Sequence, residues 1–360
     1  MIHKVLRRIL KTFNFGKERP NFRTGNDGHF LYIKKRIEGV FDDLANNHGQ
    51  YLTYRTMLTS QINDNQWIFA EDYSDVAIIL QGPIPQKTNF LETVIRHYLN
   101  LYPNLVVIIS SWQENNLSRF IETCAKLPAE QQGRLHFLQN EKPENPGIAN
   151  VNLQIVSTFN ALELASKLGK RFIIKSRVDQ VLTNHLSISI LREKFVHSMH
   201  EAPNLHKIVI GSRNTFLFRP YSFSDMLQFS DIETLISFWS VPLDDRTPQQ
   251  LKVTTNSTPM AWSMQNLAEV YLVRNYLARV GYPPEFDFLS HLNALRQYFA
   301  VVDSESLGFY WNKYSHNQSS WARSDFPYPT YEISEHDYDH PEKFFKNSLA
   351  FSVYCHQPWG

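Results

Sequence analysis

The chain has 360 residues, with 36 lysines and arginines against 35 aspartates and glutamates, and a formal net charge of +1. Hydrophobic residues make up 42% and charged residues 20%, a globular composition that suits one large domain or two. The balanced charge argues against nucleic acid as a partner, because no long basic stripe runs through the body. Two cysteines far apart, Cys124 and Cys355, indicate a reducing compartment rather than a disulfide scaffold.

Residues 1–13 predict a basic amphipathic helix. Apolar side chains recur at helical spacing on one face, and Lys4, Arg7, Arg8 and Lys11 occupy the other. This pattern is typical of a helix in the headgroup region of an anionic membrane; the alternative is docking on the protein's own core. Residues 1–28 are therefore expected to be a membrane helix and tether, with no signal peptide and no apolar run of the roughly 20 residues that span a bilayer.

A helical extension is expected over residues 29–74, and a regular alternation begins after it. Apolar runs predict strands at 76–80, 105–109, 135–138 and 172–174, and amphipathic segments predict helices at 90–101, 117–127 and 149–168. This order predicts an α/β fold with a mostly parallel, doubly wound sheet flanked by helices. The carboxyl ends of its strands would share one edge, where ligands bind, and would carry Gln81, Gly82, Ser110, Ser111, Asn140, Arg177 and Asp179.

The second half is less regular. Strands are expected at 208–211 and 214–218, a short helix at 232–239, and a long helix at 261–280 that ends at Gly281. Residues 301–360 are rich in Tyr, Trp, His and Pro and predict a wrap around a domain of residues 75–300. The aromatic content of 14% fits a sugar-binding cleft, and simple core filling is the alternative.

The run Lys175-Ser-Arg-Val-Asp179 ends the last strand of this alternation with two cations and a carboxylate. Residues two apart in a strand point the same way, so the three side chains predict a site for a phosphate ester such as a nucleotide-sugar. Asp179 is the candidate ligand of a divalent metal, Mn or Mg, although a turn or cap role is the alternative. Arg177 stands where a second acid would be, which leaves metal use open, since Lys175 and Arg177 could neutralise the phosphates themselves.

Two further segments are candidates for donor binding. Gly82 allows close approach of the backbone to a ligand, but Pro83 removes a donor, and neither a dinucleotide fingerprint nor a P-loop is present. A plain turn is the alternative for Gly82. Asn150 and Asn152 open the long helix, whose N-terminus favours anions. Helix capping and a solvated face are the alternative for these asparagines.

Two acids are candidates for the catalytic base. Glu269 lies on the long helix of the second half, and Asp225 lies at a strand end. Either could take a proton from an acceptor hydroxyl. The alternative is that each is structural, with Glu269 paired to Arg274. No histidine cluster has metal-ligand spacing, and no serine-centred nucleophile elbow is present.

Several segments together resemble the WavE-type lipopolysaccharide synthesis family, over about residues 75–300. The segments are Ile78-Ile-Leu-Gln-Gly-Pro-Ile84, Ser110-Ser-Trp112, Pro146-Gly-Ile-Ala-Asn-Val-Asn-Leu-Gln154, Lys175-Ser-Arg-Val-Asp-Gln180, Phe223-Ser-Asp-Met-Leu227 and Ala268-Glu-Val-Tyr-Leu272. The resemblance implies a GT-A-like glycosyltransferase fold and a role in building a surface polysaccharide, lipopolysaccharide or capsule. By analogy with GT-A enzymes, Asp179 takes the place of the metal- or donor-binding acid, and Glu269 resembles the acid that opens the acceptor-side helix.

We therefore expect a glycosyltransferase on the cytoplasmic face of a bacterial inner membrane. Its partners would be a nucleotide-sugar donor, a glycan or lipid-linked acceptor, and the anionic membrane surface through residues 1–13. A nucleotidyl- or phosphotransferase would also use the run that ends at Asp179. A non-catalytic nucleotide-sugar-binding subunit of a polysaccharide assembly complex is the third alternative.

Overall fold

The computed structural model describes residues 72–201, 207–252, 257–313 and 332–339. Apart from Lys313, these residues belong to one unit of the chain, which is described here by itself. The expected membrane helix and tether, residues 1–28, lie outside the described residues. The same holds for the helical extension up to residue 71 and for most of the chain after residue 313.

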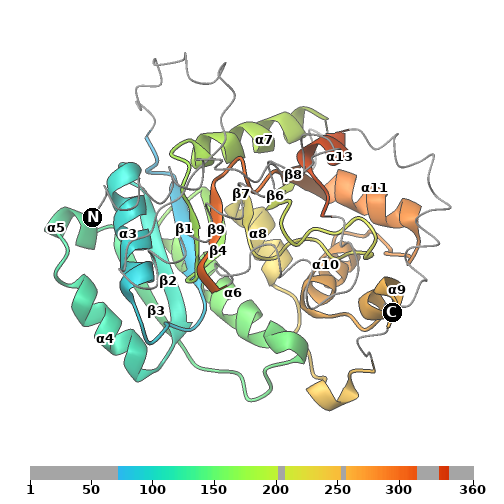
Figure 1. The fold of residues 1–360 in the computed structure, drawn as a ribbon, viewed down its shortest axis with the longest axis horizontal. Helices are drawn as coiled ribbons and strands as arrows, with labels where there is room; N and C mark the ends of the chain where they lie inside the picture. The colour runs from blue at the N-terminus through green and yellow to red at the C-terminus, as the bar shows by residue number, and fades with distance from the viewer. Residues whose placement is uncertain (1–71, 202–206, 253–256, 314–331, 340–360) are drawn as a thin grey trace, which may run out of the picture. The chain divides into compact units, whose positions relative to one another are not determined.

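The first part of the described chain forms four strands joined by helices, as the alternation predicts (Figure 1). The strands are β1 (Val76–Gln81), β2 (Val106–Trp112), β3 (Leu135–Asn140) and β4 (Phe172–Arg177). The connecting elements are α3 (Asn89–Leu101), α4 (Asn115–Cys124), α5 (Ala129–Gln132), the 3-10 turn η2 (Ile148–Asn150) and α6 (Val151–Lys167). Every residue of β1 and β2 is buried, which explains why these strands read as continuous apolar runs.

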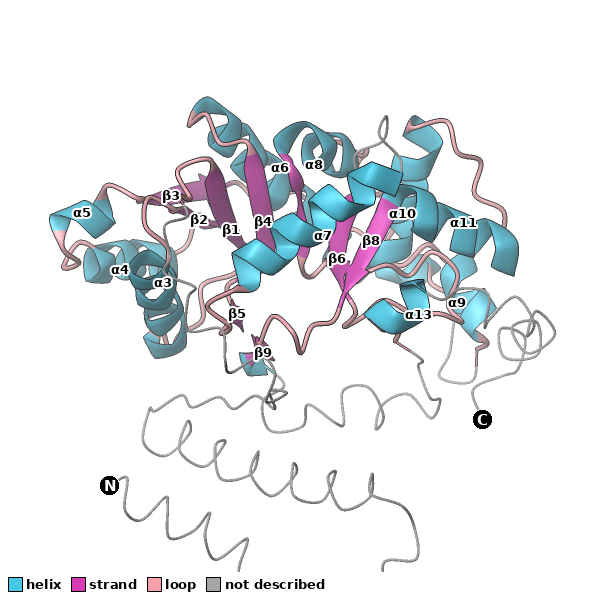
Figure 2. Ribbon diagram, turned by 90° about the horizontal axis from the view of Figure 1, so that it is seen from above, coloured by secondary structure: helices cyan, strands magenta, loops and turns pink. Residues whose placement is uncertain are grey.

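These four strands lie in the order β3-β2-β1-β4, and every neighbouring pair is parallel. Helices α3 and α4 lead from β1 outward to β3 on one face, whereas α6 returns across the other face and places β4 beside β1 (Figure 2). The direction of winding therefore reverses between β1 and β4. In open α/β sheets, the ligand site lies beyond the carboxyl ends of the strands at such a reversal.

Three more strands extend this sheet beyond β4, in the order β4-β7-β6-β8. They are β7 (Gln228–Asp231), β6 (Ile208–Gly211) and β8 (Phe299–Val302). Strand β7 is antiparallel to β4 and β6, whereas β6 and β8 are parallel to each other. The carboxyl ends of β4, β6 and β8 and the start of β7 therefore meet at one edge. The predicted α/β fold with a mostly parallel sheet is confirmed.

The strand expected at 214–218 is absent. Phe216 makes one isolated bridge with Glu332, and Asn214 has a φ of 66°. Such a left-handed residue cannot continue a strand. The segment between β6 and β7 is therefore a loop, and this loop carries Asp225 to the sheet edge.

The long helix expected at 261–280 is two helices. They are α9 (Pro259–Met264) and α10 (Ala268–Arg279). Asn266 between them has a φ of 48°, which interrupts the helical backbone. The break makes Glu269 a first-turn residue of α10 instead of a mid-helix residue.

A two-stranded ribbon, which the sequence analysis missed, consists of β5 (Gln180–Leu182) and β9 (Phe309–Trp311) in antiparallel register. The expected domain boundary at residue 300 falls inside β8, so the sheet and this ribbon continue into the predicted wrap. The remaining elements are α7 (Ser187–Glu201), α8 (Ile232–Trp239), η3 (Pro248–Gln250), α11 (Phe288–Tyr298) and α13 (Glu335–Asp339).

Helices cover both faces of the large sheet. Helices α6 and α8 pack on one face, and α7 lies across the other (Figure 2). The short α8 was predicted with its correct bounds, and its terminal Trp239 has no exposed surface. Within the described ranges, no helix combines the length and apolarity that crossing a bilayer requires.

Candidate functional site

The reversal between β1 and β4 places Gln81 beside Arg177. The two residues are paired in register, and each is the last residue of its strand. Gly82 follows with a φ of 128°, where a Cβ would lie 3.3 Å from Cγ2 of Val178. The backbone at Gly82 thus leaves β1 in a conformation that favours glycine, directly beside the end of β4. The structure therefore brings together three of the predicted donor-binding residues.

The side chain of Gln81 is held against α6. Ser157 Oγ lies 3.1 Å from Gln81 Oε1 as a hydrogen-bond donor, and Ser110 Oγ donates to the Ser157 carbonyl oxygen at 2.6 Å. Asn140 Nδ2 donates in turn to Ser110 Oγ at 2.9 Å. The polar residues at the ends of β1, β2 and β3 are thus joined in one buried hydrogen-bonded layer, which fixes the edge of the sheet.

Arg177 and Asp179 form a bidentate pair. Arg177 Nε donates to Asp179 Oδ1 at 3.0 Å, and Nη2 donates to Oδ2 at 3.3 Å. Trp311 of β9 donates from Nε1 to the same Oδ2 at 3.0 Å, and its ring centre lies 5.8 Å from the guanidinium carbon. The side chains of Arg177 and Asp179 are 25% and 19% exposed, so a ligand can reach this pair.

Lys175 does not reach the surface. Its ammonium lies 4.8 Å from the centre of the Trp239 ring and donates to the backbone carbonyl oxygen of Asp225. Burial lowers the pKa of Lys175 to about 8, although the nearby Asp225 carboxylate opposes this shift. Direct contact of Lys175 with the donor phosphates stays a prediction, and in this structure the side chain has no exposed surface with which to touch a ligand. Lys175 instead fixes Asp225.

The two predicted acids lie in one electrostatic cluster. Asp225 is 5% exposed in the loop before β7, and Glu269 is 8% exposed in the first turn of α10. Burial raises the pKa of Asp225, and the negative charge of Glu269 raises it further, whereas Lys175 and Arg177 act in the opposite direction. The structure thus brings together the cations of β4 and both candidate bases, which are separated by up to 94 positions in the sequence.

Glu269 is neutralised by a residue that the sequence analysis did not consider. Arg219 Nη2 lies 2.9 Å from Glu269 Oε1, and Ser222 Oγ donates to the same oxygen at 2.8 Å. The alternative partner, Arg274, donates from Nη1 to Asn266 Oδ1 at 2.5 Å. Glu269 is therefore tied to the loop that carries Asp225, and not to Arg274 on its own helix.

Asn152 has a structural role. Its Nδ2 donates to the carbonyl oxygens of Asn145 at 2.9 Å and Asp244 at 2.8 Å, and its Oδ1 accepts from the Asp244 N–H at 2.6 Å. This buried amide holds the start of α6 to the loop after α8. The contact of Asn152 with the donor stays a prediction, whereas the three hydrogen bonds that the structure shows join it to backbone groups within the fold.

The other predicted donor-binding residues differ in their access to solvent. Asn150 is exposed at the N-cap of α6, with a φ of 61°, and makes no side-chain cap hydrogen bond. Pro83 is exposed just after Gly82. Ser111 is buried, and its carbonyl oxygen accepts from Asn140 Nδ2 at 2.8 Å. Asn150 and Pro83 are therefore accessible at the edge, whereas Ser111 belongs to the buried layer below it.

The carboxylate expected to hold a metal is already engaged. Both oxygens of Asp179 accept hydrogen bonds, from Arg177 and Trp311. In the part of the chain that the structure describes, no group of three or more His, Cys, Asp or Glu side chains is arranged to hold an ion. Because Mn²⁺ and Mg²⁺ require several oxygen ligands, the donor set around Asp179 does not fit such a cation.

A family model described as WavE lipopolysaccharide synthesis matches residues 76–287, which is more than half of the chain. The chain belongs to the WavE lipopolysaccharide synthesis family. The region matched in this WavE-family protein starts at the first residue of β1 and ends at Asp287, the N-cap of α11. It therefore contains the edge of the sheet and both acids, whereas Trp311 lies beyond it.

Similarity to solved structures is remote. HddC from Yersinia pseudotuberculosis, complexed with GMP-PN, aligns with 13% identity and a TM-score of 0.29, over 50% of this chain and 86% of its own. The mannosyltransferase PcManGT from Pyrobaculum calidifontis, in complex with GDP-Man and Mn²⁺, aligns with 14% identity and a TM-score of 0.36, over 82% and 90%. No curated protein matches this WavE-family chain.

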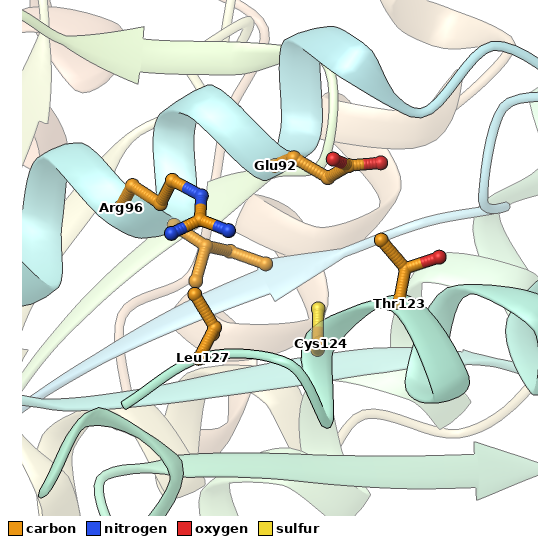
Figure 3. A pocket seen from close by; sticks show the side chains of 6 residues that line it. Glu92, Arg96, Thr123, Cys124 and Leu127 are labelled. Carbon is orange, nitrogen blue, oxygen red and sulfur yellow. The ribbon is translucent and has the colours of Figure 1, made fainter. Parts of the chain in front are cut away.

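Two hollows of this WavE-family protein lie away from the sheet edge. A cavity of about 10 Å³ between α3 and α4 is lined by Glu92, Ile95, Arg96, Thr123, Cys124 and Leu127 (Figure 3). Burial raises the pKa of the Cys124 thiol to about 11, which keeps it protonated near neutral pH. A cleft of about 500 Å³ between α7 and α13 is lined by Ile190, Glu193, Lys194, Val196, His197, Glu335 and Asp339. Neither lining includes a residue of the predicted site.

Sequence reasoning missed three residues that shape the site. Trp239 and Trp311 contact Lys175 and Arg177, and Arg219 pairs with Glu269. The run Phe309-Tyr-Trp311 offered a signal for β9, because three consecutive aromatic residues favour a strand. Arg219 offered no comparable signal, since it lies in an irregular loop and is paired only through tertiary packing.

Proposed function

We propose that this WavE-family protein is a GT-A-like glycosyltransferase that moves a sugar from a nucleotide-sugar donor to a growing bacterial surface polysaccharide, lipopolysaccharide or capsule. The observation that carries this proposal is the position of Arg177 at the reversal between β1 and β4, beside the backbone of Gly82. A planar guanidinium that is part exposed at a sheet edge suits phosphate oxygens, because its N–H groups match them bidentately. Membership in a lipopolysaccharide synthesis family favours sugar chemistry at this edge.

In this proposal, the donor phosphates lie against Arg177 and the backbone of Gly82. Asp179 orients the Arg177 guanidinium through their hydrogen bonds, and Trp311 holds Asp179 in place. Pro83 and Asn150 border the donor at the exposed rim of the same edge. The acceptor lies on the side of the loop before β7 and of α10, where Asp225 and Glu269 are the two candidates for the proton acceptor.

The test is a product assay on the full chain with a panel of nucleotide-sugars and membrane-derived acceptors. Transfer of sugar with release of the nucleotide is expected. Arg177→Ala should lower kcat/KM by about 10–100-fold, because one bidentate charge-assisted contact is worth roughly 1.5–3 kcal/mol. The matched control is Arg171→Ala, an exposed arginine just before the other end of β4, which should retain full activity.

The same assay separates the rival functions. Release of pyrophosphate would identify a nucleotidyltransferase instead. Donor binding without any transfer, when membrane acceptor is supplied, would identify a non-catalytic subunit. Unchanged kcat/KM in Arg177→Ala would contradict the donor site itself.

We further propose that the enzyme works at the cytoplasmic face of the bacterial inner membrane, held there by residues 1–13. The basis is the sequence pattern of this segment, which lies outside the described residues: an apolar face opposite Lys4, Arg7, Arg8 and Lys11. Replacing these four cations by Gln should release the protein from vesicles with anionic lipids, since each is worth about 1 kcal/mol near such a surface. The anchor would be refuted if the wild-type protein and the variant co-sedimented equally with anionic vesicles, and if the wild-type protein bound neutral vesicles equally well.

A further inference from the structure

Asp225 and Glu269 lie in one cluster, but their carboxylates differ in what they contact. Arg219 and Ser222 both bind Oε1 of Glu269, at 2.9 Å and 2.8 Å. A proton placed on Glu269 would remove the negative charge that holds Arg219 and would break a nearly buried ion pair. The Glu269 carboxylate is therefore already engaged by two donors from the loop before β7, and its contacts serve to hold Arg219.

The carboxylate of Asp225 is held differently. In the described part of the chain, no other residue donates a hydrogen bond to its carboxylate oxygens, although the residue is 5% exposed. Its backbone is anchored, because the ammonium of Lys175 binds the Asp225 carbonyl oxygen. A carboxylate with a fixed backbone, little solvent and no hydrogen-bond donor from another described residue is suited to take up a proton. Burial also raises its pKa, which brings its affinity for a proton closer to what a base needs near neutral pH.

The guanidinium of Arg219 is held between Glu269 and an aromatic ring. Its Nη2 binds Glu269, and its Nε is buried with no hydrogen-bond partner among the described residues. The guanidinium also packs over Phe216, with 5.6 Å between its carbon and the ring centre. Glu269 thus fixes the orientation of the Arg219 guanidinium, whose side chain is 13% exposed.

We infer that Asp225 is the group that takes the proton from the acceptor hydroxyl, and that Glu269 is a positioning residue that acts through Arg219. This inference rests on the proposed sugar transfer. In the step, the acceptor O–H proton passes to a carboxylate oxygen of Asp225. The acceptor oxygen forms a bond to the anomeric carbon, the bond from that carbon to the donor phosphate oxygen breaks, and its electron pair leaves on the nucleotide beside Arg177. The anomeric configuration inverts, and Asp225 returns its proton to water.

The experiment compares Asp225→Asn, Glu269→Gln and the control Glu233→Gln in the full chain, with steady-state kinetics for donor and acceptor. Glu233 is an exposed acid in the first turn of α8, so its variant tests the same change of carboxylate to amide away from the site. Asp225→Asn should lower kcat by about 10²–10⁴-fold, the usual contribution of a general base, and should keep the donor-induced thermal shift. Glu269→Gln should raise the KM for the acceptor more than it lowers kcat.

A pH profile and a rescue distinguish a base from a structural acid. The rise of kcat with pH in the wild-type protein should be absent in Asp225→Asn. Formate should restore part of the activity of Asp225→Ala, because a small carboxylate can occupy the vacated space, and it should not rescue Arg177→Ala. If Asp225→Asn folds poorly, the Asp225→Ala rescue still decides the question.

A wild-type protein that transfers sugar while Asp225→Asn retains kcat within about threefold would overturn the inference and leave the proposed function intact. Loss of kcat in Glu269→Gln that equals the loss in Asp225→Asn, with an unchanged acceptor KM, would also overturn it, as would a retained anomeric configuration. A wild-type protein that transfers no sugar from any donor would overturn the proposed function and the inference together.

Discussion

Lys175 places an ammonium group in the interior of the sheet, between the Trp239 ring and the carbonyl oxygen of Asp225. Removing an ammonium from water costs several kcal/mol, and the protein offsets this cost with a cation–π contact, one charge-assisted hydrogen bond and the nearby Asp225 carboxylate. The offset is incomplete, since burial still lowers the pKa of Lys175 to about 8 from its ordinary value of 10.5. The charge of Lys175 is therefore sensitive to mildly alkaline conditions.

This pKa predicts how stability depends on pH. Between about pH 8 and pH 10.5 the unfolded chain binds more protons at Lys175 than the folded chain does, so the free energy of unfolding should rise with pH. Relative to Lys175→Met, which cannot titrate there, the wild-type protein should gain about 3 kcal/mol over this interval. Urea unfolding at several pH values measures the difference, and Lys126→Met, at an exposed position, controls for the loss of one lysine. A pH-independent difference would show that Lys175 keeps its proton.

At the scale of elements, the ribbon of β5 and β9 connects the sheet edge to residues far along the chain. Gly308 precedes β9 with a φ of 60°, and a Cβ there would overlap Thr183 Oγ1 and lie 2.8 Å from the Asn184 N atom. The same ribbon carries Trp311, which binds Asp179. Distortion of the ribbon should therefore shift Trp311 and Asp179 and, through them, the position of Arg177.

Gly308→Ala tests this connection. We expect a loss of about 2–4 kcal/mol in the free energy of unfolding, from left-handed strain and steric overlap together, and a weaker donor-induced thermal shift. Gly281→Ala is the matched control, because Gly281 also has a positive φ, of 81°, but a Cβ there would have no atom within 4 Å. The control should lose only about 1–2 kcal/mol and keep the donor-induced shift. If both variants changed the free energy of unfolding and the donor-induced thermal shift equally, the ribbon would have no specific influence on the site.

The start of α6 depends on another long-range contact, between Asn152 and the backbone at Asn145 and Asp244. Asn152→Ala would remove all three hydrogen bonds, although Asn145 Nδ2 would still donate to the Asp244 carbonyl oxygen at 3.2 Å, and should lower the free energy of unfolding by about 2–4 kcal/mol. Asn150→Gly, two residues earlier, should have the opposite sign or no effect, because its φ of 61° favours glycine. Thermal or urea unfolding of both variants checks the contrast; similar losses would contradict the structural role of Asn152.

At the scale of the whole molecule, the site combines residues from both halves of the sheet, but its described acids do not converge on one point. Two of the three acids are already paired, Asp179 with Arg177 and Glu269 with Arg219. Mn²⁺ or Mg²⁺ alone should therefore raise the melting temperature of the donor-free protein by less than about 1 °C, since a ligand stabilises only to the extent that it binds the native state. A thermal-shift titration tests this, with Ca²⁺ as the control for ionic strength. A saturable shift that Asp179→Asn abolishes would contradict the expectation.

The regular part of the fold was accessible from the sequence because its signals are local. Continuous apolar runs separated by amphipathic segments gave β1 to β4 and their helices, and the ends of the strands gave Gln81, Gly82 and Arg177. In the second half the sequence predicted β6 and α8 with their correct bounds but missed β7. Strand β7 has four buried residues, two of them polar and one acidic, so nothing in its composition indicates a buried strand.

The sequence by itself determined the alternation of β1 to β4 with their helices, the parallel direction of these four strands and the charged edge at the end of β4, because these follow from hydrophobic pattern and from the handedness of crossover connections. Only the tertiary structure decided which charged side chains are paired and which remain accessible. Lys175 and Arg177 share one side of β4, yet one is buried beneath Asp225 and the other remains accessible beside Asp179. That division depends on Trp239, Trp311 and Arg219, which come from distant parts of the chain, and the spacing of residues within one segment carries no information about such contacts.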